Sequence, residues 1–195
     1  MDVKQQQEVK YENFFSKILS VIGKTTEEEV SSLLKKKKLT LSVAESLTGG
    51  LISAKLTTIP GSSEYFIGGV VCYSNRIKIM EAGVPASIIV KNGEVSSECA
   101  QAMAEGVRKR FRTDIGLSAT GVAGPAGVSP PRPIGQVFIA VSSHTESKWK
   151  ELHLKGTRSD IRQKAAQAAL GLLWVHLGGE DALSSLGFSK KEGEN

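Results

Sequence analysis

Two short segments of the sequence hold side chains that suit acyl-transfer chemistry. Ser46 lies in SVAESLTGG (residues 42–50), between a run typical of a strand and a Gly-Gly pair typical of a helix start. Tyr73 and Lys78 lie in YSNRIK (residues 73–78). A serine acts as a nucleophile when a neighbouring base takes its proton. Histidine often serves as that base, but none of the three in the chain lies in a comparable motif: His144, His153 and His176.

The segment around Ser46 also suits the binding of an anion. It supplies Thr48 with Gly49 and Gly50, and the glycines allow the backbone to approach a ligand closely. Free amides at a helix start stabilise a phosphate or an oxyanion. An ordinary serine cap with glycines for packing explains the same residues. The segment alone slightly favours that second interpretation.

Tyr73 and Lys78 predict a second part of the same site. Tyr73 is expected to end a strand, and Lys78 to lie in the first turn of the next helix. A lysine beside the positive end of a helix dipole, once buried, has a depressed pKa and can act as a base. Tyr73 would relay a proton or orient the serine. Taken alone, the segment is better explained by an exposed lysine and a strand-edge tyrosine.

A third segment, TGVAGPAG (residues 120–127), has the glycine and proline content of a constrained loop. Such loops form anion-binding nests. The segment lacks the Gly-Lys-Ser/Thr ending of a P-loop and the GxGxxG dinucleotide pattern. A connecting turn is the alternative, but the loop VAGPAGVSPPRP (122–133) has twelve residues, and a loop of that length in a compact domain usually serves a function. Arg158 opens a later helix and would clamp a phosphate; a solvent-facing arginine fits equally well.

The pattern of strands and helices predicts how these segments meet. Strands are expected at 39–44, at 65–73 (buried on both faces) and at 113–121, and a hairpin at 134–143 and 147–156. Helices are expected near 49–59, 75–82 with Ser74 as its cap, 85–90 and 158–177, and a turn followed by a long helix at 91–111. Two more helices are expected between 11 and 34, the second of them capped by Thr25 or Thr26. This order predicts an α/β fold, a three-layer α/β/α sandwich with a mixed sheet, and a site at the carboxyl ends of the strands.

Composition restricts the possible environment and partners. The 195 residues suit one domain, with 23% charged and 40% hydrophobic residues and a net charge of +5. No apolar run approaches the ~20 residues of a membrane span, and no signal peptide is expected. Cys72 and Cys99 form no disulfide or zinc pattern, so a reducing cytoplasm is predicted. The basic run Lys35–Lys38 fits a helix end better than a nucleic-acid site.

Five motifs in order carry a resemblance to a known family: AESLTGG (44–50), YSNRIK (73–78), GEVS (93–96), TGVAGPAG…RPIG (120–135) and GTR (156–158). Over about residues 28–178 the chain resembles the C-terminal domain of competence/damage-inducible protein A (CinA), the nicotinamide-nucleotide amidohydrolase family. The resemblance implies an α/β/α amidase domain over 28–180. A helical extension over 1–27, with 1–10 disordered, and a polar tail over 181–195 would flank it.

The resemblance implies hydrolysis of the carboxamide of nicotinamide mononucleotide, within pyridine nucleotide salvage, without a metal or organic cofactor. The implied catalytic residues are Ser46 as nucleophile, Lys78 as its base, and Tyr73. Thr120 falls on the family's Ser/Thr before the glycine loop. The expected substrate-binding residues are Glu45, Thr48, Gly49, Gly50, Asn75, Thr120, Gly121, Ala123, Gly124 and Arg158. The helix-start amides near Thr48 and Gly49 would stabilise the oxyanion. A homo-oligomer, dimer or larger, is expected.

The chain departs from the family pattern at Arg132, where a lysine is usual, and in the proline-rich insert VSPP (128–131). Two other functions remain open. A catalytically idle module would bind a pyridine nucleotide and release no ammonia. An amidase for a larger pyridine nucleotide would need a pocket that is open at the phosphate end.

Overall fold

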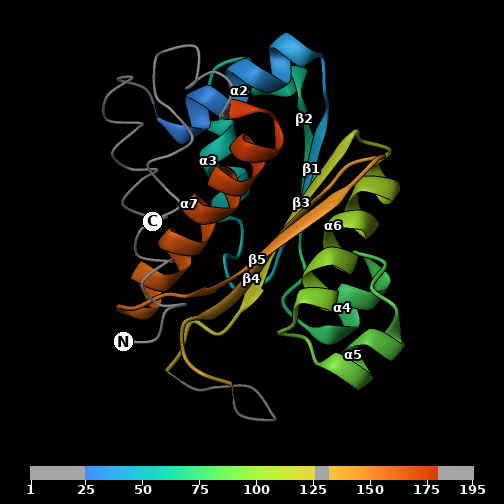
Figure 1. Ribbon diagram of the computed structural model, residues 1–195, viewed down its shortest axis with the longest axis vertical. Helices are drawn as coiled ribbons and strands as arrows, with labels where there is room; N and C mark the ends of the chain where they lie inside the picture. Colours follow the sequence, from blue (N-terminus) through green and yellow to red (C-terminus); the bar gives the residue numbers. More distant parts are fainter. Residues whose placement is uncertain (1–24, 126–131, 180–195) are drawn as a thin grey trace, which may run out of the picture.

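The computed structural model describes residues 25–125 and 132–179, which form a sheet with helices on both faces (Figure 1). The strands are β1 (Leu41–Glu45), β2 (Phe66–Val71), β3 (Ile115–Gly121), β4 (Gln136–Ser142) and β5 (Ser147–His153). The helices are α2 (Thr26–Lys37), α3 (Leu51–Thr57), η1 (Ser62–Glu64), α4 (Asn75–Met80), α5 (Ala86–Asn92), α6 (Ser97–Phe111) and α7 (Arg158–His176).

The sheet has the order β2-β1-β3-β4-β5 and is mixed, as predicted. β1 runs parallel to both β2 and β3, whereas β3–β4 and β4–β5 are antiparallel. β1 lies between β2 and β3, and all five of its residues are buried. The carboxyl ends of β1, β2 and β3 therefore reach the same edge of the sheet, where each is followed by one of the three candidate segments.

Helices α2, α3 and α7 cover one face of the sheet, and α4, α5 and α6 cover the other (Figure 1). The first layer buries large apolar side chains such as Leu34, Ile52 and Trp174 against the strands. The second buries a smaller cluster that includes Cys72, Cys99 and Met103. This is the predicted three-layer sandwich, and both cysteines belong to its core.

Local capping signals place the helix starts where the sequence predicts them. Thr25 caps α2 in a capping box with Glu28, and Ser74 caps α4 by accepting from the Ile77 amide at 3.3 Å. The basic run ends α2, with Lys38 in the left-handed conformation as its C-cap. This is the helix end that was predicted instead of a nucleic-acid patch.

The prediction that the strand at 65–73 is buried on both faces is wrong. β2 lies at the edge of the sheet, and its residues alternate between half-buried and exposed. Ile67 and Val71 are each 50% exposed. A continuous apolar run could not distinguish a central strand from an edge strand, because strand order is set by crossovers elsewhere in the chain. The predicted helix before residue 25 lies outside the described residues.

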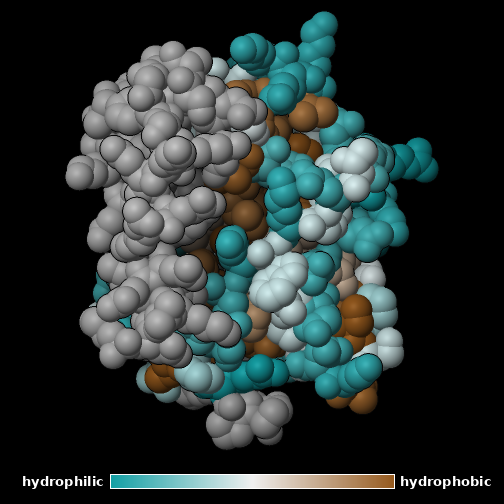
Figure 2. Space-filling view, viewed as in Figure 1, coloured by the Kyte–Doolittle hydropathy of each residue, from teal (hydrophilic) through white to brown (hydrophobic). Residues whose placement is uncertain are grey.

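Hydrophilic residues cover most of the described surface in Figure 2, and hydrophobic ones form smaller areas, one of them near α4 and α5. Met80 of α4 is 53% exposed and Val90 of α5 is 87% exposed. In the described part of the chain, no helix is both long enough and apolar enough to cross a membrane.

Candidate active site

Ser46 is the first residue after β1 and is held in place by its neighbours on the sheet. Its amide donates to the Ala119 carbonyl of β3 at 2.9 Å. On the other side of β1, the Cys72 amide donates to the Glu45 carbonyl at 2.7 Å. The backbone hydrogen bonds between the strands thus continue to the peptide unit that joins Glu45 to Ser46. This unit is held on both sides, through its N–H by β3 and through its C=O by the residue after β2. The serine is 7% exposed.

The Lys78 amine is the hydrogen-bond partner of the Ser46 hydroxyl. Lys78 Nζ lies 3.0 Å from Ser46 Oγ and 3.1 Å from the Cys72 carbonyl oxygen. The lysine is only 2% exposed. Burial lowers the pKa of Lys78 from its ordinary value of 10.5, while nearby Cys99, Cys72 and Glu94 oppose that shift. Burial thus favours the neutral amine, whose lone pair can take the serine proton.

The direction of this pKa shift was predicted from the sequence, but part of the shift was attributed to the helix dipole. α4 has only six residues, and Lys78 lies in its last turn. Its amide closes the first turn by donating to the Ser74 carbonyl at 2.9 Å. Lys78 therefore does not lie at the positive end of the helix dipole, and burial accounts for the shift.

All three histidines of the chain lie among the described residues, and each is engaged elsewhere. His144 Nδ1 lies 3.0 Å from an Arg108 nitrogen, and His153 Nε2 lies 3.2 Å from a Glu151 oxygen. His176 lies beside Glu146, with Nδ1 3.3 Å from Oε1. Within the part of the chain that the structure describes, Lys78 is therefore the basic side chain placed to generate a nucleophile at Ser46.

The segment after Ser46 turns sharply into α3. Gly49 and Gly50 have φ angles of +58° and +99°, which side chains disfavour. The Gly49 amide donates to the Ser46 carbonyl at 3.2 Å, so it is not free to bind an oxyanion as expected. Among the described residues, the amides of Leu47 and Thr48 have no hydrogen-bond acceptor. These two amides, directly after the serine, are the better candidates for an oxyanion hole.

Glu45 serves the turn and not the substrate. Its carboxylate accepts from the amides of Gly50, Ile52 and Ser53 at 2.9–3.0 Å and from the Ser53 hydroxyl at 2.7 Å. A carboxylate at a helix start satisfies amides that have no partner inside the helix. Because four donors occupy a side chain that is 1% exposed, we leave Glu45 out of the substrate-binding set.

Arg158 joins two of the predicted segments. Its guanidinium donates to the Tyr73 hydroxyl at 2.9 Å and also to the Gly124 carbonyl. Tyr73 is 62% exposed. Within the described residues, its hydroxyl contacts Arg158 and not Ser46 or Lys78. The structure therefore brings Ser46 and Lys78 together as one group, and Tyr73, Arg158 and Gly124 as a second.

Thr120 and Gly121 connect the third segment to its surroundings. The Thr120 hydroxyl donates to the Glu94 carbonyl at 2.7 Å, which ties β3 to the GEVS motif before α6. A Cβ at Gly121 would lie 2.6 Å from the Gln136 carbonyl oxygen, so only glycine fits beside β4. Both residues therefore shape the end of β3. Residues 126–131, with most of the VSPP insert, lie outside the described residues.

The other predicted substrate-binding residues differ in access. Thr48 is fully buried, and its hydroxyl has no partner among the described residues. Ala123 is 5% exposed, and Asn75 is exposed at the start of α4.

Arg162 donates hydrogen bonds to the Leu47 and Thr48 carbonyls, a role that is not predicted from the sequence. Its position one helical turn after Arg158 was the available signal.

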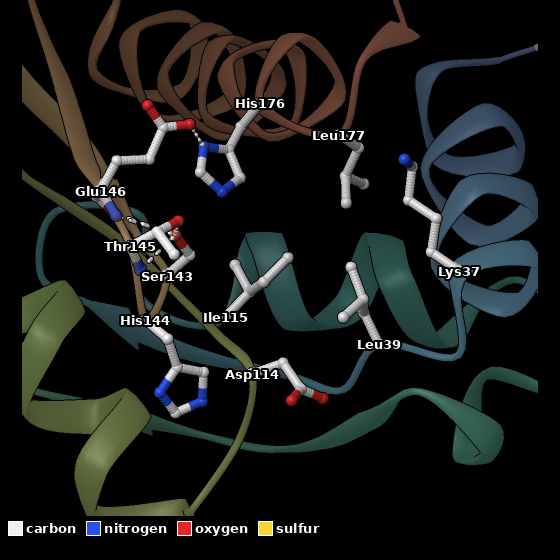
Figure 3. A pocket seen from close by; sticks show the side chains of 10 residues that line it. All are labelled: Lys37, Leu39, Asp114, Ile115, Ser143, His144, Thr145, Glu146, His176 and Leu177. Atoms are coloured by element: carbon white, nitrogen blue, oxygen red, sulfur yellow. Dashed lines mark hydrogen bonds and ion pairs between the residues drawn. The ribbon is translucent and has the colours of Figure 1, made fainter.

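A cavity of about 300 Å³ lies beside the start of β3 and the β4–β5 turn, at the other end of β3 from the predicted site (Figure 3). Its lining includes Asp114, His144, Glu146 and His176. It shares no residue with the predicted site. The described residues contain no group of three acidic, histidine or cysteine side chains able to hold a metal ion.

The chain is similar to known proteins of one family. The model of the CinA C-terminal domain matches residues 23–177. A CinA-like protein of Dictyoglomus thermophilum is 53% identical over 152 residues, which are 77% of this chain and 37% of the relative. Another from Gemmatimonas aurantiaca is 48% identical over 74% of this chain and 35% of its own length. The chain thus spans little more than a third of these relatives.

Two solved structures share the fold. The competence damage-inducible protein A of Klebsiella pneumoniae has a TM-score of 0.76 and 29% identity, covering 79% of this chain and 98% of that one. The competence/damage inducible protein of Agrobacterium tumefaciens has a TM-score of 0.72 and 33% identity, covering 78% and 95%. Because the family model matches most of the chain and the fold agrees, the chain belongs to the CinA C-terminal domain family.

Proposed function

We propose that this protein is a nicotinamide-nucleotide amidase, which hydrolyses nicotinamide mononucleotide to nicotinate mononucleotide and ammonia. The observation that carries the proposal is the 3.0 Å contact between Ser46 Oγ and Lys78 Nζ. Lys78 is buried, so its amine titrates below its ordinary range. A buried amine beside a serine hydroxyl is an arrangement that activates a nucleophile. The substrate class comes from the five-motif resemblance to the family.

In the proposed reaction, Ser46 Oγ attacks the carboxamide carbon and its proton passes to Lys78 Nζ. The carbonyl oxygen becomes an oxyanion, and the amides of Leu47 and Thr48 bind it. The C–N bond then breaks, and the carboxamide nitrogen takes a proton from Lys78 and leaves as ammonia. Water attacks the acyl-enzyme ester, Lys78 takes its proton, and the acid leaves as Ser46 regains a proton.

The mononucleotide would be held by the second group of residues. Arg158 bridges Tyr73 and Gly124, so its guanidinium lies between the residues that follow β2 and the glycine loop. A guanidinium binds phosphate oxygens in a forked geometry. We assign the phosphate or ribose to this region, between the end of β2 and the glycine loop, with Asn75 at its border. The reducing cytoplasm and the homo-oligomer expected from the sequence remain part of the proposal.

The test is ammonia release from nicotinamide mononucleotide by purified wild type, Ser46→Ala and Lys78→Ala. We expect release by the wild type and a loss of at least ~10²-fold in both variants. A wild type that binds the nucleotide but releases no ammonia would instead support the alternative of a catalytically idle module that binds a pyridine nucleotide. Release from a larger pyridine nucleotide, but not from the mononucleotide, would instead move the proposal to that substrate.

A further inference from the structure

Arg162 contacts the backbone that follows the proposed nucleophile. It extends from α7, and its Nε donates to the Leu47 carbonyl at 3.0 Å while one terminal nitrogen donates to the Thr48 carbonyl at 2.9 Å. The side chain is partly buried, and a Cβ at Gly49 would lie 3.2 Å from the same terminal nitrogen. One guanidinium therefore binds two consecutive carbonyls with the forked geometry that lysine cannot reproduce.

These two hydrogen bonds fix the orientation of the peptide units. A peptide unit is planar, and in the trans form its C=O and N–H point in opposite directions. Among the described residues, only the Gly124–Pro125 bond is cis, so the Leu47–Thr48 unit is trans. With the Leu47 carbonyl held against Arg162, the Thr48 amide points away from α7. Helix α4, which carries Lys78, lies on the opposite face of the sheet from α7 (Figure 1).

The same contact strengthens the amide as a donor. A cation that hydrogen-bonds a carbonyl polarises the whole peptide unit, so its N–H donates more strongly. The next peptide unit is also held, because the Thr48 carbonyl accepts from Arg162 and from the Leu51 amide at 3.3 Å. Within the described residues, the Thr48 amide has no acceptor of its own, and it lies two residues after Ser46.

We propose that Arg162 is a positioning residue that orients and polarises the Thr48 amide as an oxyanion donor for acyl transfer at Ser46. The inference rests on the proposed amidase function. Arg162 would touch neither substrate nor the reacting atoms. Its contribution would appear in the transition state, where the oxyanion forms, and not in the binding of the substrate.

The test compares Arg162→Ala and Arg162→Lys with wild type and with Gln163→Ala, an exposed neighbour on the same helix. We expect Arg162→Ala to lower kcat for nicotinamide mononucleotide by about 10²-fold, because a misplaced catalytic group costs roughly that much. KM should stay within about threefold, since ground-state binding is unchanged. Arg162→Lys should fall between Arg162→Ala and wild type, and Gln163→Ala should equal wild type.

A second readout separates this inference from the proposed function. A fluorophosphonate reacts with an activated serine, and its phosphoryl oxygen takes the place of the oxyanion, so the rate at which it labels Ser46 needs no natural substrate. Slower labelling of both Arg162 variants supports the inference even if the wild type releases no ammonia from the mononucleotide. Equal labelling rates in folded Arg162→Lys and wild type would overturn it. A raised KM with unchanged kcat would also overturn it and would assign Arg162 to substrate binding. If Arg162→Ala does not fold, the lysine variant decides.

Discussion

Lys78 offers a perturbation that separates catalysis from stability. Replacement by methionine keeps an unbranched apolar side chain in a position that is 2% exposed. It removes the amine and its hydrogen bonds to Ser46 Oγ and the Cys72 carbonyl. Each lost hydrogen bond costs about 1 kcal/mol net, but the desolvated amine that lowered the stability of the fold is also gone. We therefore expect the free energy of unfolding of Lys78→Met to lie within about 2 kcal/mol of the wild-type value.

Lys78→Ala removes the amine and also most of the buried stem. Truncating a buried side chain of this size costs about 2–5 kcal/mol in free energy of unfolding, because the surrounding core closes only partly. For a domain of this size, that corresponds to a melting temperature about 4–20 °C below that of Lys78→Met. The exposed Lys91→Met on α5 serves as the matched control and should resemble wild type in both stability and activity.

The activities of the two Lys78 variants should not follow their stabilities. General base catalysis contributes about 10²–10⁴-fold, so both variants should lose at least ~10²-fold in ammonia release although they differ in melting temperature. Calorimetry and a coupled ammonia assay give both quantities from the same preparations. A Lys78→Met protein that retained deamidation within about tenfold of wild type would contradict the role of Lys78 as base.

Three further predictions follow from the same contacts. Burial lowers the pKa of Lys78 below 10.5, and the neutral amine is the proposed base, so kcat/KM should rise with pH through that lowered pKa. A stopped-time ammonia assay across a pH series measures this rise, and a flat profile would contradict the prediction. Glu45→Gln should lower the free energy of unfolding by about 3 kcal/mol or more, because the side-chain amide cannot accept all four hydrogen bonds of the carboxylate. Urea denaturation measures this loss, and a change under about 1 kcal/mol would refute the capping role. Burial lowers the pKa of His176 (Figure 3) from 6.5, so the unfolded chain binds a proton at a higher pH than the folded protein does. The free energy of unfolding should therefore fall as the pH drops below about 6.5 toward the folded pKa. His176→Phe should make this pH dependence weaker in urea denaturation between about pH 5 and 7, and an unchanged dependence would contradict the prediction.

The features that the sequence predicted correctly depend on residues close together in the chain. Thr25 and Ser74 cap their helices through neighbours three residues away, so capping residues next to apolar runs are sufficient signals. Alternating strands and helices implied parallel strands, and parallel strands bring their carboxyl ends to one edge. For that reason the order of elements along the chain was enough to place the segments around Ser46, Lys78 and Thr120 near one another.

The features that the sequence missed depend on distant contacts. The edge position of β2 follows from the order of all the strands, which its own apolar residues do not encode. Arg158 contacts Tyr73 across 85 residues, and Arg162 contacts Leu47 across 115. Glu45 is expected to bind substrate only because it lies in the AESLTGG motif of the family resemblance. Only the path of the chain into α3 shows that its oxygens are already occupied.

The site combines elements from both faces of the sheet at the carboxyl end of β1. Lys78 reaches Ser46 Oγ from α4, while Arg162 holds the following carbonyls from α7 on the other face. Separate helices therefore supply the proposed proton acceptor and hold the backbone after Ser46, and the Ser46 amide is fixed by β3 between them. A substitution in α4 should then alter proton transfer, and a substitution in α7 should alter stabilisation of the oxyanion.

If so, the losses of kcat/KM caused by Lys78→Met and Arg162→Lys should differ in pH dependence, because only the first removes the titrating base. An Arg162→Lys profile that keeps the wild-type limb at a lower plateau would support this division of roles, and a shifted limb would contradict it.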